Sequence, residues 1–166
     1  GMLIDIGYLI DAVNHHKHAY YLIKNGHLDG LSSLDVEILA NVVRYHRKAL
    51  PKLRHEGFAG LSATDRFRVK VLGGILRLAA GLDRSHEGVV DRLVCHVQKE
   101  RIELLVLTRE DGELEVWAAN RRSDLLEEAL GLPILVRRAS PEEFAALNLD
   151  APDLGPLDVE GLVLEA

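Results

Sequence analysis

The chain has 166 residues, of which 48% are apolar, a formal net charge of -6 and one cysteine. This length and composition predict one globular domain or two small ones, and the lone Cys95 excludes an internal disulfide; its apolar neighbours predict a buried thiol without a redox role. Because no run of eighteen apolar residues occurs and Asp5 and Asp11 interrupt the apolar N-terminus, the sequence predicts neither a membrane span nor a secretion signal, and we expect a cytoplasmic protein.

The first residues have the apolar periodicity of helices. We expect one helix over residues 3–10, with Gly7 at a close-packing position, and a second over residues 15–23 with Asn14 as its N-cap. Asn25-Gly26 should end the second helix, because this pair favours a turn.

Two longer helices follow. Ser32 or Ser33 should cap a third helix that continues until Pro51, and Ser62 should cap a fourth that runs to about Ala80. A loop containing glycine and phenylalanine is expected between them. The inward stripe of the third helix follows the spacing i, i+4, i+7 and i+11, and comprises Leu39, Val43, His46 and Leu50.

The pattern changes after residue 88. Two strands are predicted over residues 89–97 and 101–107, joined by a short polar turn. A helix over residues 113–130 is expected next, although its first five residues could instead extend the hairpin, and a third strand over residues 132–138 follows Gly131. The fold class is therefore α+β: a mainly helical HD-type domain (residues 1–88), a small β-β-α-β domain (residues 89–138) and an acidic remainder (residues 139–166).

Charge is distributed unevenly along this chain. Residues 1–70 hold ten lysines and arginines, seven acids and six of the eight histidines, whereas residues 139–166 hold seven acids and no base. The basic half could therefore meet a polyanion even though the whole chain is acidic. The candidate phosphate-binding residues are His15, His16, Lys17, His18, Arg44, His46, Arg47, Lys48, Lys52, Arg84 and His86.

These residue types suit phosphate chemistry. Guanidinium forks and ammonium groups match phosphate oxygens, and histidines add donors when they become protonated below about pH 6.5. Arg44, Arg47 and Lys48 lie at i, i+3 and i+4, so a continuing helix would place them on one basic face. The alternative for this face is a solvated helix end, and for His46 a hydrogen-bonded core residue.

Four motifs together resemble the C-terminal region of the exopolyphosphatase/guanosine-pentaphosphate phosphatase (Ppx/GppA) family, over about residues 2–138. They are Leu3-Ile4-Asp5-Ile6-Gly7, residues 15–25, residues 40–48 and residues 77–86. The resemblance implies an HD-type helical domain and a small α/β domain, which in the family follow two actin-like lobes that hydrolyse phosphoanhydrides. We expect those lobes to be absent, and Gly73-Gly74 lies within a helix rather than in a phosphate-binding loop, so we assign no catalytic residue.

The resemblance also bears on metal binding. HD phosphohydrolases hold metal with a histidine, an adjacent His-Asp pair and a later aspartate, but here Ile4 replaces the histidine before Asp5, and the later aspartate corresponds to Ala80 or Asp83. We therefore expect neither metal nor other cofactor. A degenerate metal site remains as the alternative, and it would use Asp5, His16, His18 and His46.

Three hypotheses follow. The first is a non-catalytic module that binds polyphosphate or guanosine polyphosphate; the second is a degenerate metal-dependent phosphohydrolase acting on a nucleotide or phosphate ester. The third is an assembly domain that docks separately encoded catalytic lobes or forms a homodimer through the open edges of the hairpin at residues 89–107. Nucleic acid is not an expected partner, because Tyr20, Tyr21 and Tyr45 occur at core spacing. No membrane partner is expected.

Overall fold

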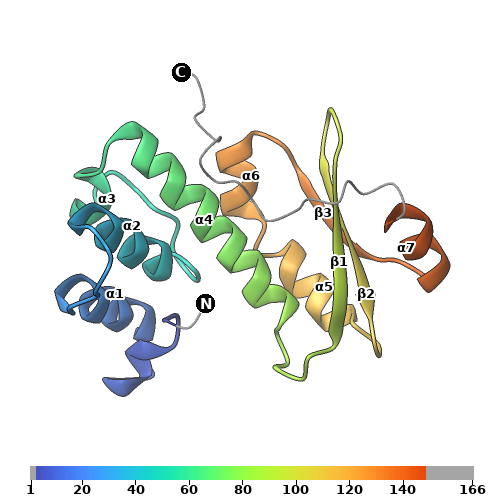
Figure 1. Cartoon of the computed structure of the whole chain (residues 1–166), viewed down its shortest axis with the longest axis horizontal. Coiled ribbons are helices and arrows are strands. Elements are labelled where there is room, and N and C mark those ends of the chain that lie inside the picture. Colours follow the sequence, from blue (N-terminus) through green and yellow to red (C-terminus); the bar gives the residue numbers. More distant parts are fainter. Residues whose placement is uncertain (1–2, 149–166) are drawn as a thin grey trace.

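The computed structural model describes residues 3–148, which form a helical layer and a small sheet on either side of one long helix (Figure 1). In chain order the elements are the 3-10 helix η1 (Ile6–Leu9), α1 (His15–Asn25), α2 (Ser33–Arg44), α3 (Glu56–Ala59), α4 (Ala63–Leu82), β1 (Val90–Val97), β2 (Ile102–Thr108), α5 (Glu113–Asn120), α6 (Asp124–Leu130), β3 (Ile134–Arg138) and α7 (Pro141–Asn148). The predicted α+β class is confirmed.

The start of the chain is less helical than expected. Residues 3–10 contain only the four-residue 3-10 helix η1, but the close-packing role of Gly7 is confirmed, because a Cβ atom there would overlap the carbonyl oxygen of His15. Asn14 occupies the N-cap position of α1 with a left-handed φ of 60°, and its backbone oxygen, not its side chain, accepts the amide of Lys17. Helix α1 thus begins directly against η1.

The serine caps predicted for α2 and α4 are confirmed. The Ser32 hydroxyl accepts the Asp35 amide at 3.2 Å, the Asp35 carboxylate accepts the Ser32 amide at 3.1 Å, and Ser62 accepts the Asp65 amide at 3.1 Å. The expectation that α2 continues to Leu50 is wrong, since it ends at Arg44. The loop expected between the two helices contains the short helix α3.

A buried arginine accounts for the early end of α2. Arg77 of α4, 5% exposed, donates to the carbonyl oxygens of Tyr45 at 3.2 Å and Lys48 at 3.4 Å, and it pairs with Asp124 at 3.0 Å. Because the Arg77 side chain donates hydrogen bonds to these carbonyl oxygens, they do not need the amides of a further helical turn. Residues 45–50 therefore form an irregular loop, with Lys48 at φ 60°.

The sheet has the order β1-β2-β3, with β1 antiparallel and β3 parallel to β2. The predicted helix over residues 113–130 is two helices, α5 and α6, and its first residues do not extend the hairpin. Around the break, Ser123 donates to the carbonyl oxygen of Asn120 at 2.9 Å and Arg122 donates to that of Ala80 at 2.6 Å. The break lets both helices pack on α4.

One face of the sheet is covered by α4, α5 and α6 and the other by α7 (Figure 1). The first core joins Leu78 and Leu126 to Leu104 and Val136, whereas the second joins Leu105 to Phe144 of α7. The acidic remainder was predicted either to be loosely held or to dock; its first part, α7, is docked, and residues 149–166 lie outside the described residues.

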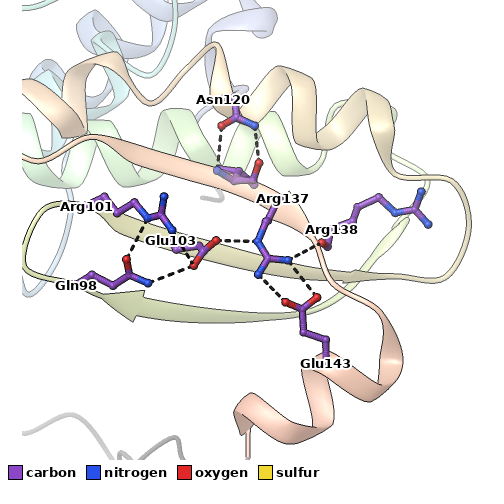
Figure 2. Close-up of polar contacts among 8 residues, drawn as sticks. Gln98, Arg101, Glu103, Asn120, Arg137, Arg138 and Glu143 are labelled. Atoms are coloured by element: carbon purple, nitrogen blue, oxygen red, sulfur yellow. Dashed lines mark hydrogen bonds and ion pairs between the residues drawn. The ribbon is translucent and has the colours of Figure 1, made fainter.

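Arg137 ties α7 to the sheet (Figure 2). Its guanidinium donates to Glu103 of β2 at 2.7 Å and to Glu143 of α7 at 2.6 Å, and hydrogen bonding to these carboxylates raises the pKa of Arg137. The pKa values of Glu103 and Glu143 are lowered chiefly by the same hydrogen bonds. Side chains on β2, β3 and α7 thus form one ionic network.

Two further expectations concern the whole chain. The division into two domains at residue 88 stays a prediction. Contacts cross this boundary in both directions: Leu78 of α4 packs in the core under the sheet, and Leu125 of α6 packs in the core beneath α2. Cys95 was expected to be buried, but it is exposed, because its side chain points to the part of the sheet face that the helices leave uncovered. Within residues 3–148 no helix is both long and apolar enough to cross a membrane.

Candidate functional site

Two histidines in the first turn of α1 are buried. His15 is 3% exposed and His16 is 6% exposed, because η1 covers this end of the helix. The ring of Tyr8 stacks on that of His15 with centroids 4.2 Å apart. The Nδ1 atom of His15 lies 3.2 Å from the carbonyl oxygen of Ala12, so it carries the donated proton and leaves Nε2 as an acceptor.

The loop after α2 brings a third buried imidazole to this place. His46 is 5% exposed, and its ring centroid lies 5.8 Å from that of His15. Its Nδ1 donates to the carbonyl oxygen of Val43 at 2.6 Å. The predicted inward position of His46 is therefore confirmed, although α2 ends at Arg44, before His46. The Nη1 atom of Arg47 donates to Nε2 of His15 at 3.4 Å. Segments 32 residues apart thus meet at these rings.

Burial and neighbouring cations favour the neutral imidazoles of His16 and His46. Burial, followed by the charge of Lys48 and smaller contributions from His15, His46 and Arg47, lowers the pKa of His16 to about 4. Burial also lowers the pKa of His46, against the opposing effects of its hydrogen bond to Val43 and of Asp5. The Nδ1 atom of His16 is buried and has no hydrogen-bond partner among the described residues.

Arginines from the second half of the chain complete the group. Arg122, between α5 and α6, is partly buried; burial lowers its pKa, and so do the charges of Arg84, Arg47 and Arg77. Arg77 is neutralised by Asp124, but within residues 3–148 no carboxylate lies within 4.0 Å of Arg47, Lys48, Arg84 or Arg122. We call the resulting group the cationic cluster; it comprises His15, His16, His46, Arg47, Lys48, Arg84 and Arg122.

Several predicted phosphate ligands lie elsewhere. The expectation that Arg44 shares a face with Arg47 and Lys48 is wrong, because α2 ends at Arg44, whose guanidinium lies 4.9 Å from the ring centroid of Tyr20. The remaining four predicted residues make no contact with the cluster. Lys17 is exposed, and His18 contacts the carbonyl oxygen of Val13 at 3.1 Å. Lys52 lines a hollow with Arg66 and Lys70, and His86 pairs with Asp83 at 3.2 Å.

Sequence reasoning missed Arg122. Its only signal was a pair of arginines, Arg121-Arg122, inside a segment predicted as one continuous helix. Helix α5 ends at Asn120, and the guanidinium of Arg122 beyond it donates to the carbonyl oxygen of Ala80 on α4.

The four candidates for a degenerate metal site do not gather into one group of ligands. Asp5, His16, His18 and His46 were the candidates for a degenerate site, but among residues 3–148 no three histidine, cysteine, aspartate or glutamate side chains converge as ligands. Ile4 instead lines an apolar hollow of about 700 Å³ together with Ile38, Ile75 and Ala79. Aliphatic side chains offer no lone pairs to a cation, so this hollow is suited to apolar contact.

The structure combines a mainly helical part with a small three-stranded sheet, and the cationic cluster draws residues from both halves of the chain. The family model described as "Ppx/GppA phosphatase, domain III" matches residues 1–129. The chain therefore belongs to the Ppx/GppA family, and the match covers its C-terminal type of domain, as the four motifs predicted. The match ends within α6, so β3 and α7 lie beyond the matched residues. The comparison with curated proteins gives no match.

Proposed function

We propose that this chain is a non-catalytic cytoplasmic module that binds ligands with a run of phosphate groups, either inorganic polyphosphate or a guanosine polyphosphate. The observation that supports this proposal most strongly is the cationic cluster. Its exposed members Arg47, Lys48 and Arg84 have no carboxylate partner among the described residues. Positive charges gathered in one place repel one another and create a positive potential, which favours an anionic ligand.

The buried histidines suit the same ligand. A phosphate oxygen that reached Nδ1 of His16 would accept a hydrogen bond there, and its negative charge would raise the pKa of the imidazole. Because the pKa of His16 is about 4 without ligand, protonation should strengthen binding only at pH values well below the ordinary range of histidine. Around pH 7 the guanidinium and ammonium groups provide the attraction.

Titration with long-chain inorganic polyphosphate at several salt concentrations tests this function. Four to six neutralised phosphates should give a log-log salt slope of roughly -3 to -4. Replacing three exposed cations of the cluster (Arg47→Gln, Lys48→Gln, Arg84→Gln) should weaken binding strongly and make the slope shallower by about 2. Guanosine polyphosphate in a parallel titration identifies which source of phosphate groups is preferred.

A matched triple variant controls for the loss of net charge. Lys52→Gln, Arg54→Gln and Arg68→Gln also remove one lysine and two arginines from exposed positions, but outside the cluster. We expect this variant to keep most of the affinity. Equal losses in both variants would mean diffuse attraction to net charge, and no binding at low salt would refute the function altogether.

A second candidate function is supported by the apolar hollow. Leu72 and Ile75 on α4 are 48% and 50% exposed and line it beside α2. A surface of this kind favours docking of the separately encoded actin-like lobes that the family resemblance implies. Purified lobes of a family member should bind the chain, and Ile75→Asp should abolish the complex; unchanged binding would exclude this face. The phosphohydrolase alternative has less support, because the candidate metal ligands do not converge.

A further inference from the structure

A second hollow lies between α4, α6 and the segment that begins at Pro51. Its volume is about 350 Å³, which is within the range of sites that hold small ligands. Phe58 lines it from the core, whereas Phe67 is 37% exposed and Leu53 is 68% exposed. The hollow therefore has an aromatic and aliphatic lining that is partly open to solvent.

Positive charges accompany this apolar lining. Arg66 lines the hollow, and its Nη1 atom donates to the carbonyl oxygens of Ala59 at 3.2 Å and Leu61 at 2.9 Å, which hold the guanidinium in place. Lys52 also lines the hollow, and within residues 3–148 no carboxylate lies within 4.0 Å of Arg66 or Lys52. A fitting ligand therefore combines a flat apolar body with groups that accept hydrogen bonds from cations.

The hollow lies near the cationic cluster along α4. Lys70, which lines the hollow, pairs with Glu128 of α6 at 2.8 Å, and Arg77 pairs with Asp124 of α6 at 3.0 Å. Lys70 and Arg77 are seven residues apart, so they share one face of α4 about 10 Å apart along its axis. Because Arg77 also donates to the carbonyl oxygen of Lys48, one elongated ligand could reach from the hollow to the cluster.

We infer that this hollow holds the base of a nucleoside polyphosphate whose phosphate groups bind the cationic cluster. The inference rests on the proposed function and selects the nucleotide from its two ligands. A nucleobase is planar and stacks on aromatic rings, and its ring nitrogens and carbonyl oxygens accept hydrogen bonds from arginine and lysine. In this arrangement Phe67 stacks on the base, while Arg66 and Lys52 donate to its edge.

Inorganic polyphosphate is less suited to this hollow. A chain of phosphates gains no attraction from Phe58, Phe67 or Leu53, and its charged oxygens would lose water against them. Arg47 and Lys48 are exposed and offer such a chain cations without an apolar lining. The aromatic lining thus favours a ligand that carries a ring as well as phosphates.

Two ligands with equal numbers of phosphates test this inference. Guanosine 5′-triphosphate and inorganic tripolyphosphate should be attracted similarly by the cationic cluster, but only the nucleotide has a base. In calorimetric titrations of the natural chain, the nucleotide should bind at least about fivefold more tightly, because stacking on an aromatic ring contributes that factor or more. Equal affinities would overturn the base site while the proposed function stands, whereas binding of neither ligand would refute the proposed function as well.

Replacing the exposed ring locates the base. Phe67→Ala should bring the affinity for the nucleotide close to that for tripolyphosphate and leave the latter unchanged, and Phe67→Tyr should keep the preference. Tyr21→Ala is the matched control, because it removes a side chain that is 61% exposed on α1 and outside the hollow. An unchanged preference in Phe67→Ala, or an equal loss for both ligands, would overturn the base site. The titrations of the natural chain decide the question even if Phe67→Ala does not fold.

Discussion

Charged side chains are used in opposite ways around the sheet and in the cationic cluster. Around the sheet, guanidinium groups have carboxylate partners: Arg137 with Glu103 and Glu143, and Arg138 with Asp111. In the cationic cluster, no described carboxylate neutralises the members contributed by the loop after α2 and by the chain after α4. The paired charges join elements to each other, whereas the unpaired ones remain available to a ligand.

Arg77 connects the loop after α2 to α6, and its loss should have the largest effect. Arg77→Met removes the donors to Tyr45 and Lys48 and leaves Asp124 without its partner. We expect a loss of about 3 kcal/mol in the free energy of unfolding, the lower end for a broken buried pair because Asp124 is 46% exposed. Urea denaturation measures it, and Arg77→Lys should recover only part. A loss below about 1 kcal/mol would show that the loop is held by other contacts.

The buried histidines should make stability depend on pH. The folded pKa of His16, about 4, lies below the unfolded value of 6.5, so the unfolded chain takes up its proton first as pH falls. Stability is complete above pH 6.5 and falls toward pH 4, by at most about 3 kcal/mol. Denaturation at pH 7 and pH 5 measures this slope, and His16→Gln should flatten it. Bound polyphosphate should oppose the loss, because an anion favours the protonated imidazole.

The ionic network of the sheet should contribute less. Arg137→Gln removes both bonds that connect Glu103 with Glu143, but the Arg137 side chain is 38% exposed, so water partly screens both pairs. We expect a loss of about 1 kcal/mol or less. Hydrogen exchange should show faster exchange of α7 amides while the helices on the other face are unaffected. Uniform loss of protection would indicate that α7 unfolds only together with the rest.

The smallest effect on stability should come from the cationic cluster itself. Arg47 is exposed and has no carboxylate partner among residues 3–148, so Arg47→Gln should change stability by less than about 0.5 kcal/mol. It should nevertheless raise the pKa values of His16 and His46, because it removes a neighbouring positive charge. Nuclear magnetic resonance titration of the imidazole protons measures this shift. Unchanged pKa values would mean that the charge of Arg47 does not act on the buried histidines.

The sequence predicted those elements whose signals are local. Ser32 and Ser62 begin their helices because a serine hydroxyl and an amide three residues later are sufficient for a cap. The strands of the hairpin were also recognisable from their apolar, β-branched composition. The prediction of helix ends failed where a distant residue determines the end. Helix α2 ends at Arg44, and no residue near that position in the sequence indicates the contact with Arg77.

The candidate site was predicted in part for the same reason. His15, His16, His46, Arg47 and Lys48 stood out as two dense clusters, and the fold brings them together. Arg122 contributes from another part of the chain, and Arg44 leaves the group because its helix stops. Which cations converge depends on where helices end, and that is set by contacts between segments.

Local chemistry in the sequence therefore determined the family, the α+β class, the serine caps and the presence of basic clusters, since each depends on residues close together in the chain. Only the tertiary structure decided which cations lack carboxylates, which edge of the sheet is open and where Cys95 points. Those properties depend on contacts between segments that are remote in the sequence. Asp124 neutralises Arg77, and the side chain of Asn120 accepts a backbone amide of β3. None of the described residues bonds to the outer edge of β1.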